Sequence, residues 1–330
     1  MKFYGTLGAA CLDEAVLIHM FRAGMTGMRL NLSHTSLARS RAMLEELYLP
    51  AARKAGLERP QLIIDLQGPE LRVGTLAQPV QLEEGGQVLL GRGGIPIPPS
   101  LLQAARAGHS LSLDDSALLL EVVEHTGSTL GCRVLRGGLL QSRKSLALLG
   151  VEVDSPALTE EDLANLDLAG SCGVTHILQP FVRGREDVET LREALRSRGL
   201  DRVQIMAKIE NRRGLDHLEE IMDAADQICI ARGDLGNSMP LWELPAVQKD
   251  ISEKCAERGV PFCLVTQLLW SMEQRAVPTR AEVADIFNGV LDGADSLMLT
   301  GETAAGRYPM EAMDYLVKTA SSALEYQRLR

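Results

Sequence analysis

The sequence predicts a (β/α)8 barrel with a small β domain inserted after its third strand. Short apolar runs alternate with longer helical patterns along most of the 330 residues, which is typical of βα units around a parallel sheet. Eight such apolar runs occur, and one Gly-rich stretch, residues 73–155, interrupts them with shorter β segments. Polar and charged residues follow almost every run, at the end of a barrel where active sites form.

The eight predicted strands share a short length and an apolar composition. They cover residues 2–7, 28–32, 61–66, 175–180, 203–209, 227–231, 261–265 and 296–299. Helical patterns separate them, at residues 13–23, 36–56, 159–169, 185–197, 241–258, 280–291 and 309–326. Thr159 and Asp162 have the spacing of a capping box if Leu158 is the residue before the cap.

The Gly-rich interruption predicts a separate domain. Its short β segments cover residues 80–82, 88–90, 110–113, 118–123 and 131–135. We therefore expect a barrel domain made of residues 1–72 and 156–330, and a barrel-like β lid domain made of residues 73–155. Loops at this end of a barrel carry function, so the insertion is expected to act as a lid.

Composition and charge argue against several classes of function. The net charge is −10 and no basic stripe occurs, so nucleic acid is not an expected partner. No apolar run reaches the ~18 residues of a membrane helix, and the N-terminus lacks the apolar region of a signal peptide. The six cysteines are scattered without zinc spacing, and Cys229 and Cys263 fall in apolar strands. We expect a soluble, reduced, cytoplasmic protein with no membrane partner.

Two neighbouring strand ends carry the most informative residues. Lys208 and Glu210 lie two positions apart at the end of strand 203–209, so they share one face of it. Asp234 follows the next strand, residues 227–231. A cation donor beside two carboxylates is what a divalent metal and an anionic substrate require together.

The other strand ends also supply polar groups. They are Arg29, Asn31, Ser33, His34, Asp65, Gln179, Arg183, Arg232, Thr266, Gln267, Thr300 and Glu302. Taken singly, each of these residues can be explained by structure without any function. His34, for example, could be a hydrogen-bonded structural histidine, and residues 232–234 could form a plain turn. Residues 301–306 have the spacing of a phosphate cradle but lack the Lys-Ser/Thr of a P-loop. The concentration of these groups at one mouth nevertheless indicates an active site.

In this order the motifs resemble those of the pyruvate kinase family. The matching segments are residues 6–8, 29–34, 65 with 68–72, 208–211, 231–236, 266–267, 278–282, 292–295 and 301–304, with Leu113-Asp114-Asp115 and residues 137–144 inside the insertion. The resemblance covers essentially the whole chain and implies a TIM barrel with a β lid. It also implies transfer of a phosphoryl group between phosphoenolpyruvate and ADP, giving pyruvate and ATP.

The resemblance implies a metal-dependent centre. Glu210 and Asp234 would hold Mg²⁺ or Mn²⁺, and Lys208 would stabilise charge on the transferring phosphoryl group. Lys208, Arg29 and Thr266 are the catalytic residues that it implies. The implied substrate-binding residues are Arg29, Lys208, Gly233, Asp234, Thr266 and Thr300, with Arg29 on the phosphate and the Gly233 and Asp234 backbone with Thr266 on the carboxylate.

The resemblance implies two further binding sites. The first is a monovalent-cation site, usually for K⁺, formed by Asn31, Ser33, Asp65 and the carbonyl of Leu66. Glu70 matches the K⁺-dependent pattern of the family. The second is the nucleotide site, for which the implied residues are Asn31, His34, Arg72 and Lys144.

The chain departs from the family pattern around this centre. Asp65 is followed by Leu66 and Gln67 instead of Thr-Lys, which keeps a backbone ligand but removes a hydroxyl and a cation. Trp270 replaces a typical Glu, residues 237–238 replace an apolar–Glu pair, residues 7–10 lack the usual Pro, and Thr300 replaces Ser. The family usually continues with a further α/β domain, whereas this sequence ends at Arg330, so we expect no regulation through that domain.

These residues leave three functions open. The first is an unregulated phosphotransferase of the pyruvate kinase type, supported by Lys208, Glu210 and Asp234. The second is a lyase, decarboxylase or transferase acting on another 2-oxo acid or enolpyruvate, because a metal with a lysine also stabilises enolates. The third is a non-catalytic binding protein. The oligomeric state is open as well, and a homo-oligomer formed through barrel surfaces is compatible with the sequence.

Overall fold

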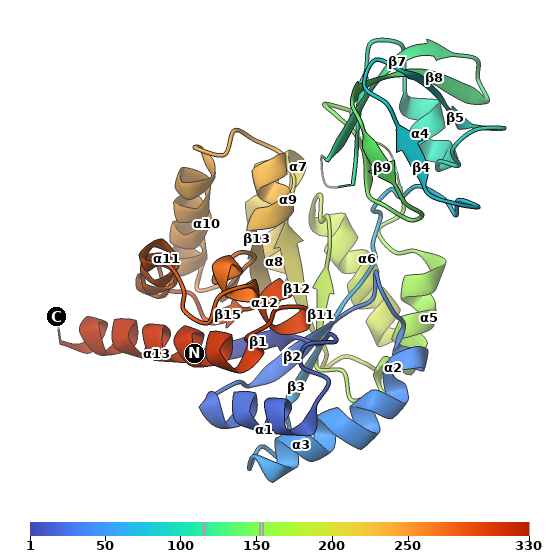
Figure 1. The fold of residues 1–330 in the computed structure, drawn as a ribbon. Helices are drawn as coiled ribbons and strands as arrows, with labels where there is room; N and C mark the ends of the chain where they lie inside the picture. Colours follow the sequence, from blue (N-terminus) through green and yellow to red (C-terminus); the bar gives the residue numbers. More distant parts are fainter. Residues whose placement is uncertain (115–116, 152, 154, 330) are drawn as a thin grey trace. The chain divides into compact units, whose positions relative to one another are not determined.

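The chain divides into two compact units (Figure 1). One consists of Met1–Gly68 with Ala157–Arg330, and the other of Pro69–Pro156. The computed structural model describes residues 1–114, 117–151, 153 and 155–329, so Asp115 of the lid motif lies outside the described residues. Each unit has its own buried apolar core.

In the first unit, the described residues form a closed barrel of eight parallel strands in the order β1-β15-β14-β13-β12-β11-β3-β2. The strands are β1 (Lys2–Thr6), β2 (Gly27–Asn31), β3 (Gln61–Asp65), β11 (His176–Gln179), β12 (Gln204–Ile209), β13 (Gln227–Ala231), β14 (Phe262–Val265) and β15 (Ser296–Met298). The predicted (β/α)8 barrel is confirmed, because every strand lies within one residue of its expected bounds.

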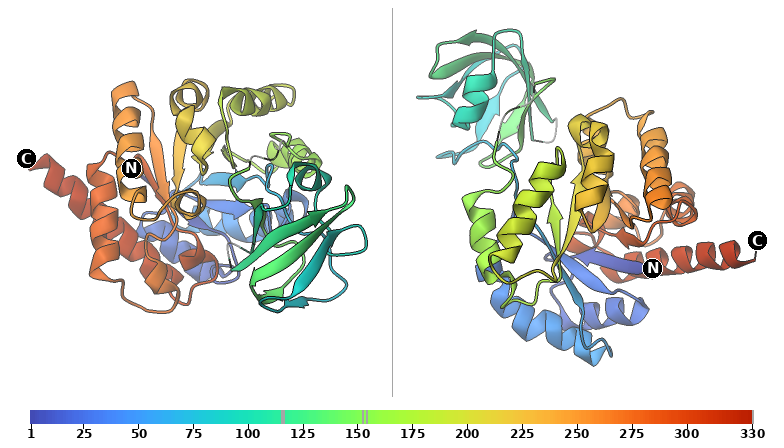
Figure 2. Two further views of the ribbon diagram at one scale, coloured as in Figure 1. Left: turned by 90° about the horizontal axis from the view of Figure 1, so that it is seen from above. Right: turned by 180° about the vertical axis from the view of Figure 1, so that it is seen from behind.

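Helices surround this barrel (Figures 1 and 2). They are α1 (Glu14–Ala23), α2 (Leu37–Met43), α3 (Leu49–Lys54), α5 (Glu160–Ala169), α6 (Arg185–Arg196), α7 (Arg212–Asp216), α8 (Leu218–Ala224), α9 (Arg232–Asn237), α10 (Leu244–Arg258), α11 (Arg280–Leu291), α12 (Gly301–Ala304) and α13 (Pro309–Arg328), with a 3-10 turn at Trp270–Glu273. The last helix packs against α1 and α11. In the described part of the chain, no helix has both the length and the apolar character needed to cross a membrane.

Helix boundaries follow local chemistry in several places. The capping box predicted at Thr159 and Asp162 is present at the start of α5. The expected single helix 36–56 instead contains a π-helical turn, Leu44–Tyr48, between α2 and α3. Pro50 in the first turn of α3 has no amide hydrogen to donate, so the regular hydrogen-bond pattern cannot continue there.

Alternate side chains of the strands fill the barrel. Ile63 and Met206 belong to a buried interior cluster that also contains both cysteines of the central strands. Because side chains alternate along a strand, Asp65 and Lys208 continue these two interior rows at the carboxyl ends of β3 and β12. The polar end of the barrel is therefore built directly on its apolar interior. All six cysteines are buried and free, including Cys229 and Cys263 of the apolar strands.

The second unit contains two antiparallel sheets. The larger has the order β10-β6-β7-β8-β5 and the smaller pairs β4 with β9. The bounds are β4 (Val80–Leu82), β5 (Gln87–Gly91), β6 (Ser110–Leu113), β7 (Leu118–His125), β8 (Thr129–Arg136), β9 (Gly138–Leu140) and β10 (Leu146–Leu148), with helix α4 (Pro99–Ala104). The five predicted β segments coincide with β4 to β8. The short elements β9, β10 and α4 were not predicted, since three to six residues show little periodicity.

Candidate active site

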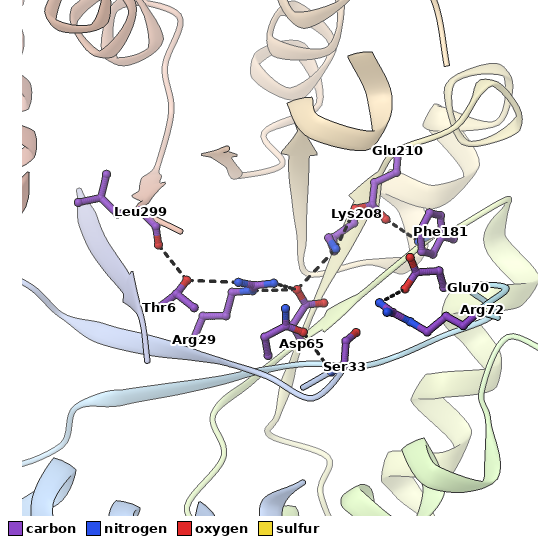
Figure 3. Close-up of polar contacts among 11 residues, drawn as sticks. Thr6, Arg29, Ser33, Asp65, Glu70, Arg72, Phe181, Lys208, Glu210 and Leu299 are labelled. Carbon is purple, nitrogen blue, oxygen red and sulfur yellow. Dashed lines mark hydrogen bonds and ion pairs between the residues drawn. The ribbon is translucent and has the colours of Figure 1, made fainter. Parts of the chain in front are cut away.

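Asp65 lies at the centre of the polar cluster in the barrel unit (Figure 3). Its Oδ2 atom accepts a hydrogen bond from Nε of Arg29 at 2.8 Å. The same atom forms ion pairs with Nη2 of Arg29 at 2.6 Å and with Nζ of Lys208 at 3.5 Å. Its Oδ1 atom is buried and has no hydrogen-bond partner within the described part of the chain. Strands β2, β3 and β12 thus bring two cations to one buried carboxylate.

Glu210 extends this cluster from the end of β12. Its Oε1 atom lies 2.8 Å from Nζ of Lys208, and its Oε2 atom accepts the backbone N–H of Phe181 at 2.8 Å (Figure 3). The Glu210 side chain is 1% exposed and that of Lys208 is 15% exposed. The pair is therefore shielded from solvent on most sides, which strengthens its electrostatic interactions.

Burial shifts the titration of both residues. It raises the pKa of Glu210 to about 7, with Lys208 opposing the rise and Asp234 adding to it. Burial also opposes the protonated form of Lys208, but Asp65 and Glu210 outweigh it and hold the pKa of the lysine above its ordinary value. The lysine is therefore a cation at neutral pH, whereas Glu210 needs a further positive charge to be fully ionised.

Thr6 supports Arg29 in a way that the sequence did not reveal. The Thr6 hydroxyl accepts a hydrogen bond from Nη1 of Arg29 at 3.3 Å and donates to the carbonyl of Leu299 at 2.9 Å (Figure 3). The guanidinium is thereby fixed from both β1 and β3. Thr6 belongs to a segment that matches the family, residues 6–8, but the sequence alone did not indicate that it contacts Arg29.

The predicted monovalent-cation residues come together at the ends of two neighbouring strands. Asn31 of β2 and Asp65 of β3 are paired in register. The amide of Ser33 donates to Oδ1 of Asn31 at 3.1 Å, which fixes the turn after β2. A buried carboxylate oxygen without a hydrogen-bond donor, such as Oδ1 of Asp65, suits a cation ligand. These residues therefore fit a bound K⁺.

A cavity of about 600 Å³ opens at this end of the barrel. Five predicted site residues line it, namely Arg29, Asn31, His34, Thr266 and Thr300. Among the described residues, the lining includes neither Leu66, which is 2% exposed in the core, nor Trp270, which is 61% exposed. These two departures from the family pattern therefore lie outside the lining of this cavity.

The residues that follow β13 lie against the residue that follows β14. Gly233 and Asp234 come after β13, and Thr266 comes directly after β14. A Cβ atom placed on Gly233 would lie 3.2 Å from Cγ2 of Thr266, so the glycine allows close packing there. Asp234 lies in the first turn of α9 and acts electrostatically on Glu210. A buried carboxylate that interacts with a second, half-buried one forms a suitable pair of ligands for a divalent cation.

Arg72 and Lys144 lie in the second unit, and each pairs with a carboxylate there. Arg72 pairs with Glu70 (Figure 3) and donates to the carbonyl of Arg143 at 2.8 Å. Lys144 lies 2.8 Å from Oδ1 of Asp114. Their approach to a nucleotide stays a prediction.

Comparison with known proteins agrees with this geometry. The family model described as pyruvate kinase, barrel domain, matches residues 1–313. The pyruvate kinase of Aeropyrum pernix is 37% identical over 332 aligned positions, which cover 100% of this chain and 71% of that protein. Those of Geobacillus stearothermophilus and Staphylococcus saprophyticus are 36% and 33% identical, each over 99% of this chain and 58% of their own length. The chain therefore belongs to the pyruvate kinase family.

Proposed function

We propose that the protein transfers a phosphoryl group between phosphoenolpyruvate and ADP, giving pyruvate and ATP. The observation that carries this proposal is the buried cluster of Arg29, Asp65, Lys208 and Glu210. Phosphoryl transfer requires little covalent chemistry from the protein, and depends on positioning and on positive charge at the transferring group. Two fixed cations beside carboxylates provide that combination.

Glu210 and Asp234 are the proposed ligands of Mg²⁺ or Mn²⁺. Burial and the charge of Asp234 raise the pKa of Glu210, so this pair lacks a positive charge that a divalent ion would provide. When bound, the ion would act as a Lewis acid on phosphoryl and enolate oxygens. Asn31, Ser33, Asp65 and the Leu66 carbonyl are the proposed ligands of K⁺, supported by the unpartnered Oδ1 atom of Asp65.

Arg29 and Lys208 are proposed to act on the phosphoryl group itself. Arg29 donates from Nε to Asp65 and from Nη1 to Thr6, and its Nη2 forms an ion pair with Asp65. Because a guanidinium has five N–H donors, these contacts with described residues leave donors for a phosphate. Lys208 is held by Asp65 and Glu210, and its ammonium would stabilise the charge that develops on the phosphoryl oxygens. Asp65 thus orients both cations.

The remaining assignments follow the cavity and the strand ends. Gly233, Asp234 and Thr266 are proposed to bind the carboxylate of the substrate, and Thr300 to complete its site. His34 and Asn31 line the cavity and are proposed to approach the nucleotide. Arg72 and Lys144 are proposed as further nucleotide ligands, as the family resemblance implies. Leu66 and Trp270, which depart from the family pattern, do not line the cavity. We propose the phosphotransferase because the charged cluster and the family membership both support it.

A coupled assay of pyruvate formation tests the proposal. The purified protein is mixed with phosphoenolpyruvate, ADP, Mg²⁺ and K⁺, and each ion is omitted in turn. We expect pyruvate to form only with the divalent ion and faster with K⁺. Folded protein that binds Mn²⁺ but forms no pyruvate above background would contradict the proposal. A screen of 2-oxo acids and enolpyruvates would then test the lyase and decarboxylase alternatives.

A further inference from the structure

Arg232 uses all three of its guanidinium nitrogens on other parts of the protein. Nε and Nη2 donate to the backbone carbonyl of Thr266 at 3.2 and 2.7 Å. Nη1 donates to the two carboxylate oxygens of Asp285, in α11, at 2.8 and 2.7 Å. It also lies 3.5 Å from the side-chain oxygen of Gln248. The side chain is 12% exposed, so this arginine acts mainly within the protein.

Thr266 has a backbone conformation that needs such support. Its φ angle is +77°, and that of Gln267 is +55°. A β-branched residue rarely adopts a positive φ, and the strain costs roughly 1–3 kcal/mol unless the surroundings hold it. The two donors of Arg232 hold the carbonyl of Thr266, and Gly233 packs against its methyl group.

We propose that Arg232 is a positioning residue, which holds Thr266 in the left-handed conformation that places it in the lining of the cavity. Asp285 fixes the arginine from α11, outside the barrel strands. The turn at the end of β13 contains Arg232, Gly233 and Asp234 in succession. This one turn therefore positions both Asp234, the proposed metal ligand, and Thr266. The kinetic part of this inference rests on the proposed function, in which Thr266 contacts the substrate carboxylate.

The planar shape of the guanidinium is essential to this role. Two of its nitrogens donate converging hydrogen bonds to one carbonyl oxygen, and its remaining nitrogen reaches a carboxylate. A lysine keeps the charge but is a single point donor, so it cannot make both sets of contacts. Arg232→Lys should therefore lower kcat/KM for phosphoenolpyruvate by on the order of 100-fold, through displacement of Thr266.

A double-mutant cycle distinguishes this role from a general structural one. The variants are Arg232→Lys, Thr266→Ala and both together, assayed for kcat/KM. If Arg232 acts through Thr266, the double variant should be within about threefold of the worse single variant. Losses that multiply would overturn the proposal. Asp285→Asn provides a second variant with a smaller loss in the same direction, should Arg232→Lys not fold.

Arg192→Lys is the matched control. Arg192 also joins a carboxylate to a backbone carbonyl, since its nitrogens lie 2.9 Å from Asp226 Oδ2 and 2.8 Å from the Ala224 oxygen, before the start of β13. It lies at the opposite end of that strand from Arg232, so its replacement should leave kcat/KM near that of the unmodified protein. A loss equal to that of Arg232→Lys would contradict a specific role of Arg232.

A crystal structure of Arg232→Lys provides a readout that does not depend on activity. We expect residue 266 to relax toward a negative φ, and the affinity for oxalate with Mn²⁺ to fall. An unchanged φ with unchanged oxalate affinity would overturn the proposal. If the unmodified protein fails to convert phosphoenolpyruvate, the proposed function is wrong, and these two measurements still decide the role of Arg232.

Discussion

The Nζ atom of Lys208 lies 2.8 Å from Oε1 of Glu210, and the two residues are separated by one position at the end of β12. Their spacing puts both side chains on one face, and the barrel interior buries them beside Asp65. Burial then raises the pKa of Glu210 to about 7. A short sequence motif thus becomes a buried charged centre, which is the basis of the proposed divalent-metal site.

Replacement of Lys208 by methionine should reduce turnover far more than substrate affinity. In the proposed function the ammonium would stabilise charge that develops in the transition state, so we expect kcat to fall by on the order of 10²–10³-fold. The Kd of phosphoenolpyruvate, measured with Mn²⁺ by calorimetry, should change by less than about threefold. Lys318→Met is the control, because that lysine is 74% exposed. Equal losses in kcat and affinity would contradict the assigned role.

Metal affinity should depend on pH through Glu210. Its pKa is raised to about 7, so below that pH a proton occupies the carboxylate and the metal must displace it. The affinity for Mn²⁺ should fall about tenfold per pH unit below that value and level off above it. Glu210→Ala should abolish metal-dependent binding. Titrations one pH unit above and below this value measure the effect, and equal Kd values would argue against it.

Asp162 should contribute more to stability than Thr159, the residue that caps helix α5. Its carboxylate is fully buried and accepts the amides of Gln67, Gly68 and Thr159 at 2.9, 3.1 and 2.9 Å. Asp162→Ala should lower the free energy of unfolding by about 3 kcal/mol, because buried amides lose their acceptor. Thr159→Ala removes the cap and the hydroxyl donor to Asp162, but leaves the buried amides their acceptor, so it should cost about 1 kcal/mol. Urea unfolding compares them, and equal costs would contradict this view of Asp162.

Trp270 should have little influence on substrate use, although it departs from the family pattern. Its side chain is 61% exposed and does not line the cavity. Trp270→Glu should therefore change the KM of phosphoenolpyruvate by less than about twofold, as for most surface substitutions. Steady-state kinetics with phosphoenolpyruvate varied would measure this. A large decrease in KM would show that the tryptophan restricts the site.

The strands and the central charges could be predicted from local patterns. Each apolar run is short and distinct. The alternation of side chains puts Lys208 and Glu210 on one face, and Asp65 comes at the end of the third run. The shortest helices, such as α9 and α12, were not predicted, because four to six residues show no helical periodicity. The π-helical turn before Pro50 also lacked a sequence signal.

The supporting contacts of the site could not be predicted in the same way. Arg232 reaches Thr266 across 34 residues and Asp285 across 53, so no local pattern encodes their contact. The positive φ of Thr266 depends on these long-range contacts, because threonine alone disfavours it. The exposure of Trp270 and the burial of Leu66 were likewise set by packing between distant segments.

Phosphorus NMR of one reaction mixture tests the central claim most directly. The protein is incubated with phosphoenolpyruvate, ADP, Mg²⁺ and K⁺, and the phosphorus signals are followed over time. Our account predicts that the phosphoenolpyruvate signal falls as the γ-phosphate of ATP rises by the same amount, and that Lys208→Met slows both changes together. A phosphoenolpyruvate signal that stays constant, or phosphorus that appears only as inorganic phosphate, would contradict it.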